Sequence, residues 1–223
     1  MSETAVSPKR ASSDVAFTPS VKAFQERRGS RRSYARMEIS GGFRAAITPD
    51  LAAFLSQVDS AVLSTANALG QPYAQHRGGP KGFIKVIDDT TLGFADYSGN
   101  KQYITLGNLA DNNRAFLLLI DYATGRRIKL WGHARVVDDQ EMIGRLMPPG
   151  YDARPEQAIV FSIAAWDINC PQHIPQKFDA ADVAKTLEES QTRISALQSE
   201  NAALRRALAQ AHSPSGAVAA EAG

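Results

Sequence analysis

Several cations in the sequence stand beside residues that form turns. Arg77 precedes a run of glycines, and Lys85 follows that run inside an apolar stretch. Residues 97–101, Tyr-Ser-Gly-Asn-Lys, are expected to open a helix over residues 101–109. A helix start has free backbone N–H groups and a positive dipole end, so Ser98 and Lys101 would help it hold an anion. Arg77 and Lys85 could reach the same anion from neighbouring strands, but this spacing equally fits a helix cap with ordinary surface cations.

A second group of polar side chains follows the last apolar stretch of the β pattern. It consists of Trp166, Asn169, Gln172 and His173, and Pro171 fixes the backbone between them. A tryptophan can cover a flat ring, and Asn, Gln and His can hydrogen-bond a ring edge or a substrate. The alternative is a strand end with a tight proline turn; the crowding of polar groups favours a functional loop.

Other chemistries find little support. The four histidines are too scattered for a zinc site, and the single cysteine, Cys170, has no cysteine partner for metal or disulfide bonding. There is no glycine-rich loop of the Walker or Rossmann pattern and no nucleophile elbow. No metal site is therefore expected.

The elements that would position these residues form a mainly β domain over residues 48–178. Thr48 and Pro49 predict a helix start, with a capping hydroxyl followed by proline at the first helical position. Many short strands with few helices between them predict a small antiparallel barrel. The expected strands are 61–66, 73–76, 83–87, 91–95, 114–122, 127–137 and 159–166.

The segment before this domain, residues 1–47, is interpreted as a basic and largely disordered arm. Residues 1–18 lack periodicity, and residues 21–36 could form one short basic helix. Such an arm could touch nucleic acid or a membrane, but a solvated segment is favoured and no nucleic-acid module is recognised. No stretch approaches the apolar length of a membrane span, and no signal peptide is expected, so we expect a cytoplasmic protein without membrane contact.

After the domain, residues 179–212 predict a helix with a heptad repeat. Apolar residues dominate the two seam positions, and Asn201 occupies one of them. A buried Asn at this position favours two parallel, in-register helices, so we expect a coiled coil. The rival is an amphipathic helix folded back on the barrel. Residues 213–223 are expected to be flexible.

The stretch 59–137 resembles the pyridoxamine 5'-phosphate oxidase family. That family has an Arg, then a Lys that closes a strand, an aromatic-centred strand, a Ser-x-x-Lys turn, and an Asn-x-Arg before a long apolar strand. The corresponding residues here are Arg77, Lys85, Phe94, Ser98 to Lys101, and Asn112 to Arg114.

The resemblance implies an FMN-binding split β-barrel that forms a homodimer with the flavin in its interface. Arg77, Lys85, Ser98 and Lys101 would hold the FMN phosphate, with Asn100 in place of a second basic residue. The polar side chain at Arg127 would approach the flavin ring.

Further candidates for the flavin edge or a substrate are His76 and the loop of Trp166, Asn169, Gln172 and His173. This loop replaces the oxidase's substrate-binding end. The resemblance therefore implies an FMN-dependent oxidoreductase acting on a different small-molecule substrate or electron donor. The alternative is a non-catalytic flavin- or haem-binding module of the same fold.

Overall fold

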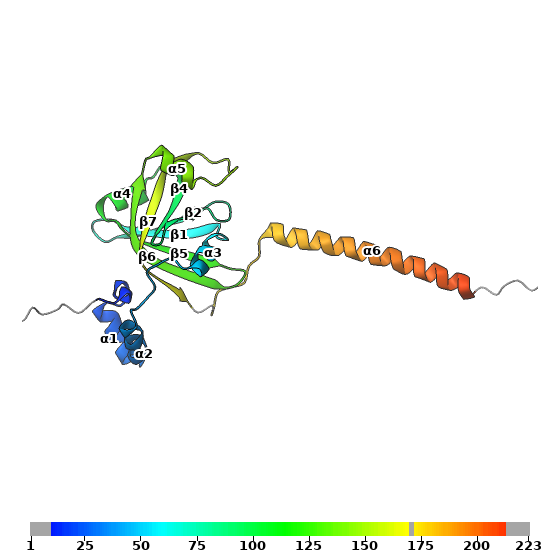
Figure 1. Ribbon diagram of the computed structural model, residues 1–223, viewed down its shortest axis with the longest axis horizontal. Coiled ribbons are helices and arrows are strands. Elements are labelled where there is room, and N and C mark those ends of the chain that lie inside the picture. Colours follow the sequence, from blue (N-terminus) through cyan, green and yellow to red (C-terminus); the bar gives the residue numbers. More distant parts are fainter. Residues whose placement is uncertain (1–9, 170–171, 213–223) are drawn as a thin grey trace, which may run out of the picture. The chain divides into compact units, whose positions relative to one another are not determined.

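The computed structural model describes residues 10–169 and 172–212 of the chain (Figure 1). The chain divides into two compact units, Met1–Gln176 and Lys177–Gly223. The first unit contains a sheet with short helices, and the second contains one long helix. The mainly β fold expected from the sequence is confirmed.

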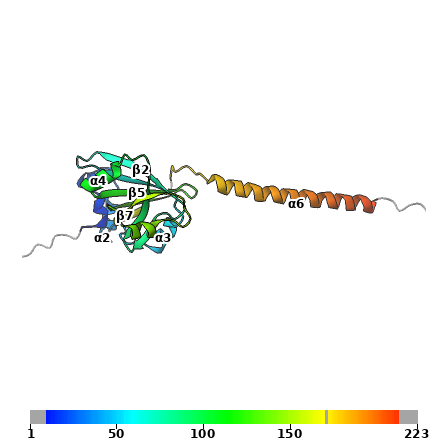
Figure 2. The same cartoon turned by 90° about the horizontal axis from the view of Figure 1, so that it is seen from above.

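Seven antiparallel strands form one sheet in the order β2-β1-β5-β6-β7-β4-β3. Figures 1 and 2 show this sheet curling round the core, so that β1 and β5 lie across from β4 and β7. The strands are β1 (Ser60–Ala66), β2 (Pro72–Gly78), β3 (Lys85–Asp88), β4 (Thr91–Tyr97), β5 (Arg114–Asp121), β6 (Arg126–Val137) and β7 (Pro155–Asn169). The helices of this unit are η1 (Ser12–Val15), α1 (Pro19–Arg27), α2 (Arg31–Ile39), α3 (Pro49–Leu55), α4 (Ile104–Asp111) and α5 (Gln140–Leu146).

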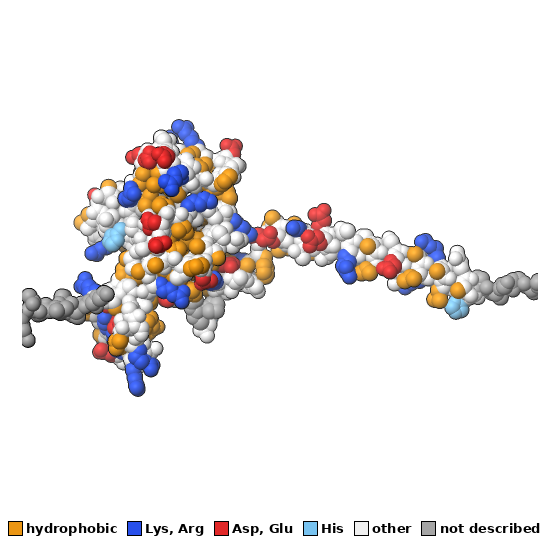
Figure 3. Space-filling view, in the orientation of Figure 1, with side chains coloured by type: hydrophobic (Ala, Val, Ile, Leu, Met, Phe, Trp, Pro, Cys, Tyr) orange, Lys and Arg blue, Asp and Glu red, His pale blue; other side chains and the backbone are white. Residues whose placement is uncertain are grey.

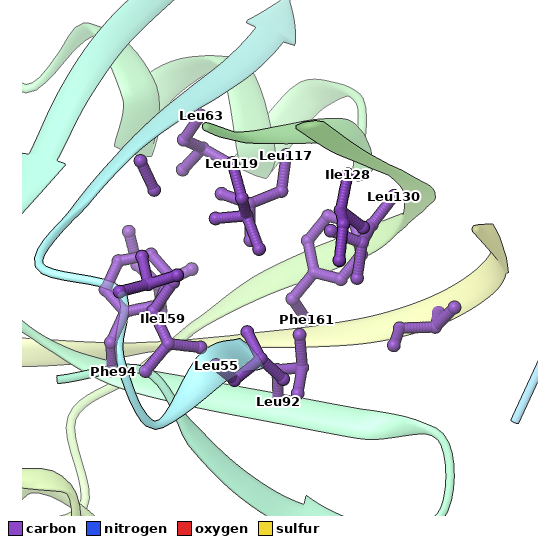
Figure 4. Packing of buried hydrophobic residues seen from close by; sticks show 14 of the residues in the cluster. Leu55, Leu63, Leu92, Phe94, Leu117, Leu119, Ile128, Leu130, Ile159 and Phe161 are labelled. Carbon is purple, nitrogen blue, oxygen red and sulfur yellow. The ribbon is translucent and has the colours of Figure 1, made fainter. Parts of the chain in front are cut away.

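The core lies inside the curled sheet. Strands β1 and β5 alternate between buried and partly exposed residues, as expected for strands with one face on a core. Apolar side chains from both sides of the curl point toward one another (Figure 4). Helix α3 closes this core with Leu51 and Leu55, and it begins where expected: Thr48 Oγ1 accepts a hydrogen bond from the Leu51 backbone N–H (3.2 Å).

Strand β7 carries an extra residue that changes which side chains face the core. Trp131 of β6 pairs with Ala165, but the next residue, Gly132, pairs with Ile163, so Ala164 is left over in a bulge. Because side chains alternate along a strand, this insertion turns Trp166 inward, opposite core residue Leu130. The bulge also brings the β6 backbone so close that a Cβ on Gly132 would clash with the Ser162 carbonyl oxygen.

The segment before α3 differs from the expected arm. Residues 10–18, expected to be disordered, include η1, in which Ser13 is fully buried. Two helices, α1 and α2, replace the single helix expected over residues 21–36. Aromatic packing accounts for this order: Phe43 stacks on Trp131 of β6 with ring centroids 5.3 Å apart, and Phe17 packs against Phe43.

The second unit contains α6 (Ala180–His212), which confirms the helix expected over residues 179–212. None of its residues is buried.

The bulge makes a testable demand on Gly132. We expect Gly132→Ala to lower the free energy of unfolding by about 3 kcal/mol, because the new methyl group meets backbone that cannot move aside. Gly144→Ala is the matched control: Gly144 lies in α5 with open space around its Cα, so alanine should stabilise the protein by up to about 1 kcal/mol. Urea unfolding measures both, and equal effects would contradict the close approach of β6 and β7.

Candidate functional site

A polar pocket of about 230 Å³ opens where the two ends of the curled sheet approach each other. We call it the seam pocket. Strands β2 and β4, the start of β7 and the segment leading into α4 supply its walls. It is lined by Gln75, Arg77, Asp96, Tyr97, Gly99, Asn100, Lys101, Tyr103, Thr105, Leu106, Glu156 and Gln157.

An ion pair between Arg77 and Asp96 forms the floor of the seam pocket. It joins β2 to β4, which are not neighbours in the sheet, and the two side chains are only 11% and 6% exposed. Gln157 Nε2 donates to the second Asp96 carboxylate oxygen (2.7 Å), and Arg77 Nη2 donates to Gln75 Oε1 (3.0 Å). Burial lowers the pKa of the Arg77 guanidinium, and the negative charge of Asp96 opposes that shift, so Arg77 stays charged.

Helix α4 is fixed against the same wall by two hydrogen bonds. Thr105 Oγ1 donates to Gln75 Oε1 (2.8 Å), and Asn108 Nδ2 donates to Thr65 Oγ1 of β1 (2.9 Å). All four side chains lie on the core face of β1 and β2 or on the face of α4 turned toward it. The segment before α4 is therefore held over the pocket.

That segment is a turn and not the first turn of a helix. The helix expected over residues 101–109 is α4, but residues 97–101 do not form its first turn: α4 begins at Ile104, because Lys101 (φ 58°) and Tyr103 (φ 52°) have left-handed backbone, which an α-helix cannot contain. Ser98 Oγ instead donates to Glu156 Oε1 (2.9 Å). Asn100 and Lys101 are exposed to solvent and line the seam pocket from this turn.

Two polar atoms beside the seam pocket are buried without a hydrogen-bond partner, Arg77 Nε and Tyr97 OH. Burial raises the pKa of the Tyr97 phenol, so this group is a neutral donor at neutral pH. Buried polar groups are normally satisfied, and unsatisfied donors at a pocket wall point to a ligand with acceptor atoms. Together with Lys101 and Asn100, these donors fit a phosphate oxygen.

Lys85 does not join this group. It pairs with Gly93 on β4, and directly opposed residues of antiparallel strands place their side chains on the same face. Gly93 faces Ile87 and Leu146, whereas Asp96 lies on the alternate face with Phe94. The expectation that Lys85 reaches the same anion as Arg77 is therefore not met within this chain.

Arg127 and His76 lie on the outer face of the sheet. The row Arg77, Ala61, Leu119, Ile128 runs across four strands on the core face, so Arg127 next to Ile128 points to the opposite face. His76 alternates with Arg77 in the same way.

The outer face has its own polar groups. Arg127 Nε is buried without a partner, and His76 Nε2 lies 3.0 Å from Ser60 Oγ. Burial lowers the pKa of Lys129, the nearby Asp167 carboxylate (4.0 Å) raises it, and Arg127 lowers it again. This side of the sheet thus carries an excess of positive charge among half-buried groups.

The loop after β7 begins beside Arg127, since Asn169 is the register partner of Arg127. Gln172 and His173 are exposed, and His173 has left-handed backbone (φ 64°). Residues 170 and 171 lie outside the described part of the chain.

Trp166, expected to cover the face of a ligand ring, is buried in the core instead. The residue is 1% exposed, its Nε1–H donates to the Ala46 carbonyl oxygen (2.8 Å), and Arg44 lies over the ring face. Since the bulge in β7 turns it inward, it is part of the core and cannot cover a ligand ring.

Among the residues that line the seam pocket, sequence reasoning named only Arg77, Asn100 and Lys101 as site residues. Of those it missed, Gln75 carried a usable signal, because it lies two residues before Arg77 on β2 and therefore on the same face. Asp96, Thr105 and Gln157 are brought to the pocket by packing between segments distant in sequence. In the described residues no cluster of His, Cys, Asp or Glu could hold a metal ion, and no helix is long and apolar enough to cross a membrane.

Residues 47–170, more than half of the chain, match the family model described as pyridoxamine 5'-phosphate oxidase. The chain belongs to this family. The match spans all seven strands, including both walls of the seam pocket. It confirms the expected split-barrel fold. No curated protein matches the chain.

Solved structures similar to this family member include HupZ from Group A Streptococcus, with 18% identity, 59% of this chain and 99% of that chain covered, and a TM-score of 0.44. An FMN-binding protein from Syntrophomonas wolfei has 12% identity, 65% and 97% coverage and a TM-score of 0.43. A protein related to general stress protein 26 from Clostridium acetobutylicum has 14% identity, 56% and 88% coverage and a TM-score of 0.38.

The Arg77–Asp96 pair should be essential to stability in a way that exposed pairs are not. Asp96→Ala leaves a buried, unpaired guanidinium and should cost about 3–5 kcal/mol of unfolding free energy. Asp50→Ala, which breaks the exposed pair with Arg126, should cost less than about 1 kcal/mol. Chemical denaturation measures both. Replacing both charges, Arg77→Met with Asp96→Leu, should recover much of the loss; no recovery would contradict the charge-based explanation.

Proposed function

We propose that the protein binds FMN, with the phosphate in the seam pocket, and acts as an oxidoreductase on a small-molecule substrate other than pyridoxamine phosphate. The observation that carries the proposal is the convergence of Arg77, Tyr97, Asn100 and Lys101 on one pocket of a chain in this family. Two of these side chains have buried donor atoms without a partner.

Charge balance in the seam pocket determines which residue contributes most to phosphate binding. Asp96 neutralises Arg77, and Glu156 accepts from Ser98, so the pocket is not simply cationic. Lys101 is an exposed cation on the pocket wall for which the described contacts include no ion pair. Lys101 would therefore make the main charge-assisted contact, and Arg77, oriented by Asp96, would donate through Nε.

The ring end of the flavin is proposed to lie on the outer face beside Arg127. A flavin that contacts Arg77 from the core face cannot contact Arg127 of the same chain, because the sheet separates them. The two contacts are compatible only if two chains share each flavin, and we therefore propose a homodimer. His76 on the outer face, and Gln172 and His173 in the loop after β7, are then candidates for the ring edge or substrate; the side chain of Asn169, the remaining candidate, lies outside the described part of the structure.

The bound flavin would supply hydride or electron transfer, and the protein would supply binding and charge. Arg127 would hold positive charge against the ring, favouring the reduced, anionic form. Haem, the alternative cofactor, is less well supported, because the three candidate histidines come from separate segments: His76 on β2 lies beside Ser60 of β1, His133 is on β6, and His173 is in the loop after β7.

The phosphate assignment predicts a difference between FMN and riboflavin, which lacks the phosphate. Lys101→Ala should weaken FMN binding by about 10- to 100-fold, as expected for one lost charge-assisted bond, and leave riboflavin binding unchanged. Lys85→Ala is the matched control, because it removes a cation outside the pocket, and it should change neither affinity. Titrations followed by flavin fluorescence measure both ligands. Equal losses for both flavins, or a Soret band in the purified protein, would remove the assignment.

A site shared by two chains predicts that two variants with weak FMN binding restore each other's affinity in a mixed dimer. Lys101→Ala and Arg127→Ala chains should each bind FMN weakly. In a mixed dimer one site would carry both changes and the other neither, so about one site per mixed dimer should regain the native affinity. Purified mixed dimers, separated by two affinity tags, are titrated with FMN. No recovery in a verified mixed dimer would place both contacts on one chain and contradict the shared site.

A further inference from the structure

Helix α6 exposes a row of large apolar side chains along its length. Leu187, Leu204 and Leu208 are 64%, 62% and 61% exposed, and Ile194 and Leu197 are about half exposed. Figure 3 shows apolar side chains recurring between charged ones along this helix. Helices in proteins are stabilised mainly by packing of an apolar face, so an apolar row along a helix of 33 residues calls for a partner surface.

The apolar side chains fall on one stripe with a seven-residue repeat. One seam position holds Leu187, Ile194, Asn201 and Leu208, and the other holds Val183, Ser190, Leu197, Leu204 and Ala211. Ile194, Leu197, Asn201 and Arg205 border a shallow hollow on this stripe. Side chains spaced in this way form the hole into which a partner helix inserts a knob residue.

We propose that this stripe binds the α6 helix of a second copy of the chain, in a parallel and in-register two-stranded coiled coil. In this arrangement Asn201 faces Asn201, and the two amides can hydrogen-bond inside the seam. An out-of-register pairing would place each amide against leucine and leave it unsatisfied.

Charges beside the seam agree with the same arrangement. Glu200 would lie opposite Arg205 of the other helix, which gives one attractive pair on each side. The other flanking cation near the centre, Arg193, would face the neutral Gln198. No like charges meet across the central heptads, so a second copy fits this surface in shape, polarity and charge.

The coiled coil is short, and it would form in the full chain whether or not flavin is bound. Four heptads with Ser190 and Ala211 in the seam would pair weakly as separate helices. Joining the helices to barrels that dimerise would raise their local concentration and favour pairing. Because the barrels would dimerise without α6, the experiment has to detect contacts between the two α6 helices. A measurement of oligomeric state alone would not do so.

The experiment uses disulfide trapping in the full chain. Asn201→Cys is introduced in a Cys170→Ser background, and the protein is oxidised gently. Efficient disulfide-linked dimers are expected, and Ser199→Cys, on the outer side of the helix, should crosslink at least about tenfold less because it faces away from the seam. Adding Leu197→Asp with Leu204→Asp should abolish the Asn201→Cys crosslink, whereas Thr192→Asp with Ser199→Asp adds the same charge outside the seam and should preserve it.

Each alternative outcome overturns the proposal. Equal crosslinking from positions 201 and 199 would indicate random collision. A crosslink between Ser190→Cys of one chain and Asn201→Cys of another, without any between two Asn201→Cys chains, would indicate antiparallel helices. No crosslink from position 201 in a protein that circular dichroism shows to be folded would mean that α6 has another partner. None of these outcomes bears on the FMN titration, so the two proposals fail independently.

Discussion

The ion pair between Arg77 and Asp96 connects the two ends of the curled sheet. Strand β2 lies at one edge and β4 next to the other, and no backbone ladder joins them. Desolvating two charges is costly, and the hydrogen bonds from Gln157 to Asp96 and from Arg77 to Gln75 offset part of that cost. The pair therefore determines how far apart the sheet ends stand, and the seam pocket is the space left between them.

The same ion pair reduces the positive charge that Arg77 offers to an anion in the pocket. Asp96 orients Arg77 but cancels much of its charge, so an anion would depend on groups supplied by the turn before α4. That turn is held in place by Thr105 and by the left-handed backbone at Lys101 and Tyr103. Positive charge on a fixed turn, beside buried donors without partners, is a combination suited to phosphate.

The sequence predicted much of this arrangement, and the failures have a common physical cause. The helix start at Thr48, the apolar strands and the C-terminal helix depend on local patterns, which a sequence displays directly. Lys85 and Trp166 depend on side-chain parity, which one register step or one bulge reverses. Asp96 and Gln157 reach the pocket through contacts between distant segments, and no spacing along the sequence predicts their positions.

The segment before the barrel, residues 10–47, is also ordered by contacts between residues distant in sequence. Composition indicated a solvated basic arm, but Phe43 stacks on Trp131 and Phe17 packs against Phe43, and these aromatic contacts order the arm. Two rings separated by many residues act together only once Trp131 is placed on the outer face of β6. Composition averages over such isolated aromatic side chains, so it underestimated the order of residues 10–47.

A crystal structure of the protein with FMN bound would show whether the seam pocket receives the phosphate. We expect the phosphorus atom within about 4 Å of Lys101 Nζ, in charge-assisted hydrogen-bond range, and the ring against Arg127 of the partner subunit. Phosphate on the outer face of the sheet, or anywhere beyond contact with Lys101 and Arg77, would contradict this assignment.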